Sequence, residues 1–299
     1  MSEVAIEVSD LSKRYGDQTV VDGVSFSVRT GAVTGFLGPN GAGKTTTLRC
    51  LLGLARPSGG TATVLGRPYA QLDDPAHRVG ANLEVCGAHP GRSGRQHLRA
   101  LAAMARIPDS RVDEVLELVE MRDAADRRYG KYSMGMRQRL GLAATLLGDP
   151  EILVLDEPAN GLDPAGIRWL RDLLRTSAGE GKTVLVSSHV LAEVAQTVDD
   201  VVVIHRGRIV EQGPVEKLTS ASQGEVVVRS PEGAKLADAA RAKGLTVRTY
   251  DDGALGIEGV DAPTVGQLAF DVDVPLHQLY QSQASLEDVF FGLTGGAES

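Results

Sequence analysis

The most constraining feature of this sequence is one short segment in which glycines are followed by a lysine and a threonine. It reads Gly38-Pro39-Asn40-Gly41-Ala42-Gly43-Lys44-Thr45 and fits the pattern G-x-x-x-x-G-K-[ST]. A strand-like apolar run over 33–37 precedes it, and helix-like residues over 45–54 follow it. Glycines let backbone N–H groups turn toward a phosphate, and a helix N-terminus favours negative charge there. The strand–loop–helix setting favours a phosphate-binding loop over a glycine-rich surface turn.

The side chains of this segment predict its ligand. Lys44 can reach the β- and γ-phosphates of a nucleotide, and the Thr45 hydroxyl can ligate Mg²⁺. The residues expected to bind the nucleotide here are Gly38, Pro39, Asn40, Gly41, Ala42, Gly43, Lys44, Thr45 and Thr46.

Two adjacent acids follow a second apolar run. Ile152–Leu155 has the length of a strand that is buried on both faces, and Asp156 and Glu157 come directly after it. Asp156 can hold Mg²⁺ through water, and Glu157 can polarise an attacking water molecule. The alternative is a helix N-cap, because Pro158 follows, but the upstream loop favours the catalytic interpretation.

The order of the expected elements predicts an α/β fold. Strands alternate with helices, which indicates a parallel sheet. After about residue 220 the order becomes β-α-β-β-α-β, which is typical of a ferredoxin-like α+β domain. We therefore expect one domain over 3–220, with a helical subdomain at about 90–145, and an accessory domain over 221–299. Expected strands lie at 5–8, 24–28, 33–37, 61–65, 152–155, 183–187, 201–205, 226–229, 245–249, 254–258 and 274–279, and expected helices at 45–54, 96–120, 136–147, 164–177, 190–197, 232–243 and 263–270.

Composition excludes several other classes of protein. A hydrophobic content of 42% with 23% charged residues is ordinary for a globular protein. Most of the net charge of −8 lies after residue 220, where 12 acidic and 5 basic side chains argue against nucleic-acid binding. The two cysteines, Cys50 and Cys86, form no metal-binding spacing. Apolar runs are far shorter than the roughly 20 residues of a membrane span, so any span is expected from another chain.

Many families share the loop and the two acids, which by themselves leave kinases, GTPases and helicases open, and a further motif separates these families. The segment Tyr132-Ser133-Met134-Gly135-Met136-Arg137-Gln138-Arg139 resembles the signature sequence of ABC ATPases, whose usual form is LSGGQ. Ser133 and Gly135 match the family positions that touch the γ-phosphate from the opposing subunit. Met134 and Met136 depart from the family's glycine and glutamine. A serine at the start of a helix is also an ordinary N-cap, and that role is compatible with phosphate binding.

Three more matches occur in the order that the ABC family requires. Asn160-Gly161-Leu162-Asp163 resembles the D-loop, which implies that Asp163 lies near the nucleotide and the dimer interface. His189 follows the expected strand 183–187 and matches the switch histidine that contacts the γ-phosphate. Tyr15 matches the aromatic residue that stacks on adenine, although a tyrosine at the end of a hairpin is common in any fold.

One position departs from the family pattern. Glu84 occupies the expected place of the Q-loop glutamine, which senses Mg²⁺ and meets the membrane partner. This substitution, the YSMGMRQRL signature and the C-terminal domain resemble the ABC-2-type, antibiotic-exporting branch of the family.

The resemblance implies a mechanism and partners. ATP would lie between the Lys44 loop of one subunit and the Ser133 segment of another, with a homodimer favoured over a heterodimer. Separate permease chains would hold the protein at the cytoplasmic face of the membrane and would export a drug, antibiotic, lipid-like or peptide substrate. The alternative is a non-transport ABC ATPase acting on nucleic acid or ribosomes. The 46–132 region contains no sustained heptads and the chain has one ATPase unit, which argues against that alternative.

Overall fold

The computed structural model describes residues 3–83, 87–190, 197–217, 225–250 and 252–281, which form two compact units. One unit lies within residues 1–213 and the other within 214–299. The expected domain boundary at 220/221 falls among residues 218–224, outside the described ranges. Among the described residues, no helix is both long enough and apolar enough to cross a membrane.

The first unit is organised around a six-stranded sheet. Its strand order is β5-β6-β7-β3-β8-β9, and the neighbours from β5 to β8 pair in parallel. Nearly every residue of β3, β6, β7 and β8 is buried, as a parallel sheet covered on both faces requires. The predicted α/β fold is therefore confirmed. The strands are β5 (Val79–Asn82), β6 (Ile152–Leu155), β7 (Thr183–Ser188), β3 (Val33–Leu37), β8 (Asp200–His205) and β9 (Arg208–Pro214).

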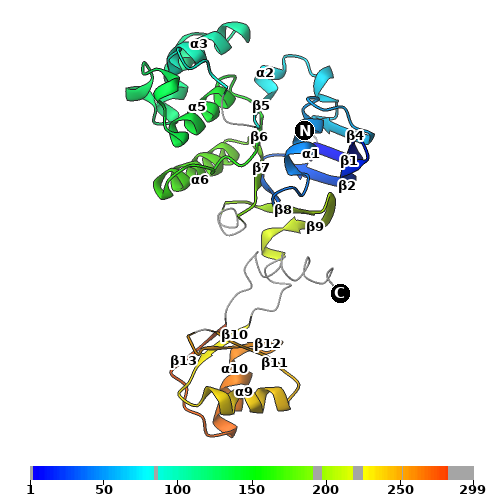
Figure 1. Cartoon of the computed structure of the whole chain (residues 1–299), viewed down its shortest axis with the longest axis vertical. Coiled ribbons are helices and arrows are strands. Elements are labelled where there is room, and N and C mark those ends of the chain that lie inside the picture. Colours follow the sequence, from blue (N-terminus) through cyan, green and yellow to red (C-terminus); the bar gives the residue numbers. More distant parts are fainter. Residues whose placement is uncertain (1–2, 84–86, 191–196, 218–224, 251, 282–299) are drawn as a thin grey trace. The chain divides into compact units, whose positions relative to one another are not determined.

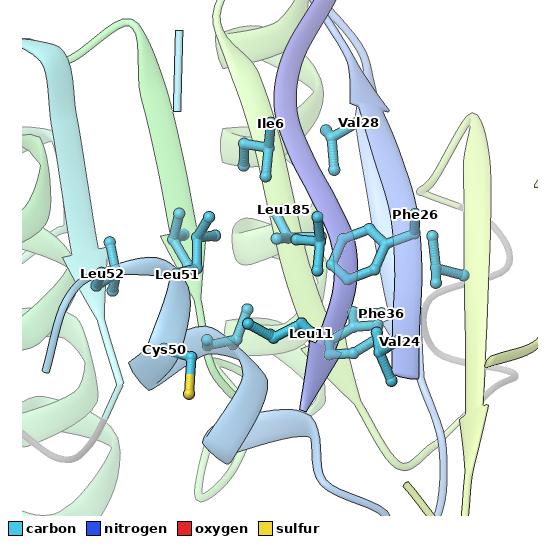
Figure 2. Packing of buried hydrophobic residues seen from close by; sticks show 14 of the residues in the cluster. Ile6, Leu11, Val24, Phe26, Val28, Phe36, Cys50, Leu51, Leu52 and Leu185 are labelled. Carbon is cyan, nitrogen blue, oxygen red and sulfur yellow. The ribbon is translucent and has the colours of Figure 1, made fainter. Parts of the chain in front are cut away.

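A three-stranded antiparallel sheet, in the order β2-β1-β4, packs against this core. Its strands are β1 (Val4–Tyr15), β2 (Gln18–Arg29) and β4 (Gly59–Val64). Figure 2 shows its apolar side chains meeting α1 (Lys44–Leu51) and the central sheet. The rings of Phe26 and Phe36 stack there with centroids 5.2 Å apart, which joins the two sheets. β1 continues to Tyr15, beyond the expected strand 5–8. A register shift between Val8 and Leu11 interrupts the two-residue alternation on which the prediction depended, so the predicted strand ends too early.

Helix α1 ends at Leu51 instead of at the expected residue 54, because Gly53 stops it. Gly53 has a φ of 69°, and its N–H donates to Cys50 O at 3.1 Å. The N–H of Leu54 donates to Arg49 O at 2.8 Å, which completes a Schellman motif.

The helical subdomain lies between β5 and β6 in chain order. It contains α3 (Gly94–Met104), α4 (Ser110–Leu118) and α5 (Met134–Leu146), and Figure 1 shows α3 and α5 on the side of the central sheet away from α1. The expected helical stretch 96–120 is two helices, since Pro108 interrupts the backbone N–H series. Residue Ser93 and residue Gln96 form a capping box that starts α3. Shorter helical turns are η1 (Tyr69–Gln71), α2 (Pro75–Arg78), η2 (Arg122–Ala124) and η3 (Tyr129–Lys131).

The second unit has the element order β-α-β-β-α-β expected from the sequence. Its four strands pair antiparallel in the order β11-β12-β10-β13, and both helices lie on one face of that sheet (Figure 1). Val226, Val228, Leu236, Ile257 and Val265 are fully buried between the sheet and the helices. The last strand starts later than the expected 274–279. The elements are β10 (Val226–Arg229), α9 (Gly233–Ala242), β11 (Thr246–Thr249), β12 (Leu255–Glu258), α10 (Ala262–Asp271) and β13 (Gln278–Gln281).

Close packing of α5 on the edge strand β5 predicts that Gly80→Ala destabilises the first unit. A methyl group at position 80 would lie 2.3 Å from Thr145 O and 2.8 Å from Pro150 Cγ. Overpacking of this kind typically costs about 1–3 kcal/mol of unfolding free energy. Gly179→Ala in α6 (Pro164–Gly179) is the matched control, because no atom lies within 4 Å of its added methyl group. Urea unfolding followed by circular dichroism measures both, and equal midpoints for the two variants would contradict the packing argument.

Candidate functional site

The glycine-rich loop joins β3 to α1, as the sequence predicts. Gly41 and Gly43 have φ values of 80° and 107°, in the region that favours glycine. A methyl group at Gly38 would lie 2.2 Å from Ile204 O, so this position requires glycine as well. The loop and α1 surround a cavity of about 170 Å³, lined by Val20, Pro39, Asn40, Gly41, Gly43, Lys44, Thr45, Thr46 and Glu157.

The turn between β8 and β9 holds this loop in place through backbone hydrogen bonds. The N–H of Gly207 donates to Ala42 O at 3.0 Å, and Gly207 O accepts from the N–H of Asp22 at 2.9 Å. Gly207 has a φ of 80°, and a methyl group there would lie 2.6 Å from Val20 O. The loop is therefore fixed between the two sheets of the unit.

Lys44 is the cation of the cavity. The residue is 5% exposed, and its ammonium donates to Gly38 O at 2.6 Å and to Pro39 O at 3.2 Å. Its Nζ also lies 3.2 Å from Oε1 of Glu157. A buried ammonium held by neutral carbonyls and one carboxylate retains the ability to attract the oxygens of a phosphate.

Asp156 joins the loop to the sheet. Its Oδ2 accepts from the Thr45 hydroxyl at 2.6 Å, and its Oδ1 accepts from the Ser187 hydroxyl. Asp156 is 8% exposed, and its N–H donates to Asn82 O at 2.8 Å. A hydroxyl and a carboxylate in contact are hard oxygen donors that fit Mg²⁺.

Glu157 adopts an uncommon backbone conformation. Its φ is 50°, and its N–H donates to the Ser187 hydroxyl at 2.9 Å. A non-glycine residue in this region costs on the order of 1 kcal/mol or more, so its surroundings must hold it there. The carboxylate lies between Lys44 and His189, with Oε2 2.7 Å from His189 Nδ1. Because an ionised carboxylate can only accept, Nδ1 is the donor in this contact.

The signature segment and the D-loop meet at a second, wider cavity. Ser133 starts α5, and its hydroxyl accepts from the N–H of Met136 at 3.2 Å. Asp163 starts α6, and its Oδ1 accepts from the N–H of Gly166 at 2.8 Å. The cavity measures about 430 Å³ and is lined by Ser133, Met134, Gly135, Met136, Arg139, Gly161, Leu162 and Asp163. None of these residues lines the cavity of the glycine-rich loop.

Tyr15 is an expected site residue that lines neither cavity, and Glu84 is not among the described residues. Tyr15, at the end of β1, is 49% exposed and does not line the loop cavity. The Lys13 ammonium lies 4.7 Å from the centre of its ring. Glu84 belongs to residues 84–86, which lie outside the described ranges.

Sequence reasoning missed Val20, Asn82 and Ser187. Ser187 contacts both Asp156 and the N–H of Glu157, and it is fully buried. The signal was a pair of serines at the end of an apolar strand, since the carboxyl ends of parallel strands lie at one edge of a sheet. Val20 is the third residue of β2, and nothing in the local sequence marks its proximity to the loop.

Comparisons with known proteins agree with this architecture. The family model described as ABC transporter matches residues 21–160, and a domain family of unknown function matches residues 224–287. The chain is 36% identical over 304 residues to the bacitracin transport ATP-binding protein BcrA of Bacillus licheniformis, covering 97% of each chain. It is also 36% identical over 309 residues to the Nod factor export ATP-binding protein I of Burkholderia orbicola, covering 99% of this chain and 98% of the relative.

A solved structure supports the same relationship. The structure described as an ATP binding subunit of an ABC transporter has a TM-score of 0.66 and 26% identity, covering 73% of this chain and 92% of that chain. Transport proteins are thus the relatives found, and the non-transport alternative is not favoured. Because similarity of this degree runs through nearly the whole length of the chain, this protein belongs to the ATP-binding proteins of ABC transporters, the ATPase subunits that energise a separate membrane permease.

Proposed function

We propose that this protein is the Mg²⁺-dependent ATPase of an exporter, working as a dimer whose two copies share each nucleotide. The observation that carries the proposal is the Glu157 carboxylate held between Lys44 Nζ at 3.2 Å and His189 Nδ1 at 2.7 Å. A carboxylate, a cation and an imidazole meet there beside a cavity that backbone glycines shape for phosphates. Such a group can position and deprotonate a water molecule next to a γ-phosphate.

Each residue of the loop site has a separate task in this proposal. The loop amides and Lys44 bind the phosphates, and Thr45 and, through water, Asp156 would hold Mg²⁺. Bound there, Mg²⁺ would supply positive charge for the phosphate oxygens. Glu157 accepts the proton of the attacking water, and His189 orients the Glu157 carboxylate through Nδ1. Ser187 fixes both acids, because its hydroxyl donates to Asp156 and accepts from the N–H of Glu157.

The separation of the two cavities supports a dimer, because one chain alone does not bring its signature segment to its own loop cavity. Ser133, Gly135 and Asp163 line a cavity that shares no residue with the loop cavity of the same chain. We assign these three residues to the nucleotide bound by the opposite copy. Tyr15 and Glu84 belong to the proposed site on family resemblance alone, as adenine contact and metal-sensing position.

The domains and the cargo complete the proposal. Residues 3–220 form the ATPase domain with the helical subdomain at about 90–145, and residues 221–299 form the accessory domain. The protein is attached to the cytoplasmic face of the membrane through its permease and does not act on nucleic acid. Relatives named for bacitracin transport and Nod factor export support an exported antibiotic, drug, lipid-like or peptide cargo.

The Lys44→Ala variant tests nucleotide binding. Removing the cation also removes its charge-assisted contacts with the phosphates, each of which is worth about 1.5–3 kcal/mol. We expect ATP affinity to fall at least about 100-fold in titration calorimetry. Lys235→Ala is the matched control, because this lysine has a half-exposed side chain on α9 in the second unit. Unchanged affinity in Lys44→Ala would overturn the assignment of the loop.

The Glu157→Gln variant tests the chemistry separately from binding. Glutamine keeps the shape of glutamate but is not a base, and loss of a general base typically slows turnover by about 10²–10⁴-fold. We expect ATP binding to persist and the ATP-bound dimer to accumulate, which light scattering with ATP can detect. Glu258→Gln, at an exposed position of β12, is the control for charge removal. Near-normal hydrolysis by Glu157→Gln would sink the proposed role.

A further inference from the structure

Three helices of the first unit meet at one polar contact that the proposed chemistry does not use. Trp169, on α6, donates from its indole Nε1 to Leu118 O at 3.2 Å. Arg139, on α5, places the centre of its guanidinium group 4.2 Å from the centre of the Trp169 ring. Its Nη1 donates to Val119 O at 3.0 Å and to the Glu120 carboxylate at 2.8 Å.

The contact satisfies the C-terminal end of α4. The last carbonyls of a helix have no intrahelical donor, and those of Leu118 and Val119 receive the indole and guanidinium N–H groups instead. The Arg139 side chain is only 16% exposed, so little water competes for its charge. A cation shielded in this way interacts more strongly with an aromatic face than an exposed one does.

A second contact, one turn away along α5, joins α5 to the D-loop that precedes α6. Gly135 and Arg139 are four residues apart on α5 and so lie on the same face of that helix. A methyl group at Gly135 would lie 3.2 Å from Gly161 O, and one at Gly161 would lie 2.4 Å from Met134 Cγ. The start of α5 and the D-loop therefore contact each other directly, and the Arg139–Trp169 contact lies one turn further along α5.

We infer that Arg139 and Trp169 are positioning residues that lock the signature segment to the D-loop, so that both present one preformed face to the nucleotide of the second copy. The inference rests on the proposed dimeric site. Without the contact, the close approach at Gly161 and the apolar packing of α6 would remain, but they would fix the relative orientation of Ser133 and Asp163 less tightly. The second copy would then have to order them when it binds, and that cost weakens association.

The apolar packing that holds α6 in place does not depend on Trp169. Leu170 and Leu174 of the same helix are 4% and 3% exposed, and they anchor it independently of the indole. Arg168, the exposed neighbour of Trp169, supplies a matched control on the same helix. Trp169→Leu removes the ring and the N–H donor, whereas Trp169→Phe keeps a ring for the guanidinium and loses the donor.

The experiment introduces Trp169→Leu, Trp169→Phe or Arg168→Leu into the full-length Glu157→Gln protein. We expect Trp169→Leu to bind ADP in its own loop with an affinity within about twofold of the parent, while the dissociation constant of the ATP-bound dimer rises at least tenfold. Trp169→Phe should give an intermediate rise, and Arg168→Leu should match the parent. Analytical ultracentrifugation measures the dimer, and calorimetry with ADP measures binding to the single chain.

Hydrogen exchange without nucleotide provides a readout that does not depend on the dimer. The amides of Met136 and Gly166, which donate to Ser133 and Asp163, should both exchange faster in Trp169→Leu. Unchanged exchange at these two amides, or dimerisation of Trp169→Leu as tight as that of its parent, overturns the inference. A Glu157→Gln parent that stays monomeric with ATP counts against the proposed function instead, and the exchange result then decides the inference.

Discussion

The site depends on one carboxylate at the end of a buried strand. Asp156 accepts from a hydroxyl of α1 and from a hydroxyl of β7, so it ties the loop after β3 to the ends of two neighbouring strands. Its near-complete burial makes these bonds costly to lose, because each lost partner leaves a desolvated charge. Lys44 and Glu157 are the chain neighbours of Thr45 and Asp156, the two residues that the first of these bonds joins, so that bond also fixes where they lie. The Ser187 hydroxyl, which donates to Asp156, also accepts from the backbone N–H of Glu157 and so fixes the position of that residue.

Local sequence patterns were sufficient to predict the site where the functional residues and the secondary structure that positions them lie in one short segment. The glycine-rich loop and the two acids each follow a buried strand, so the parallel sheet places Lys44, Asp156 and Glu157 together at its carboxyl edge. The strands of that sheet were predictable for the same reason, because burial on both faces leaves continuous apolar runs. β5 and β9 are exceptions. The four-residue strand β5 contains glycine and asparagine, and β9 has no fully buried residue, so neither carries such a signal.

Features set by distant parts of the chain were not predictable. The bulge in β1 and the close approach of Gly207 to Val20 depend on how two sheets fit together, which no local window contains. The contact between Arg139 and Trp169 joins residues 30 positions apart whose types suit many surface roles. Asp163 was predictable in one of its two roles only. Its motif was recognisable, and in the described fold its carboxylate also starts α6, so one side chain serves both the helix and the proposed interface.

The turn that braces the glycine-rich loop has a consequence for nucleotide selection. A loop held in shape by Gly207 and by the strand ends spends little conformational entropy when a ligand arrives, and its affinity comes from preorganised backbone amides. Those amides recognise phosphates, which adenine and guanine nucleotides share. A preformed loop of this kind therefore suits any nucleotide that carries these phosphates, and selection between bases has to come from residues outside the glycine-rich loop.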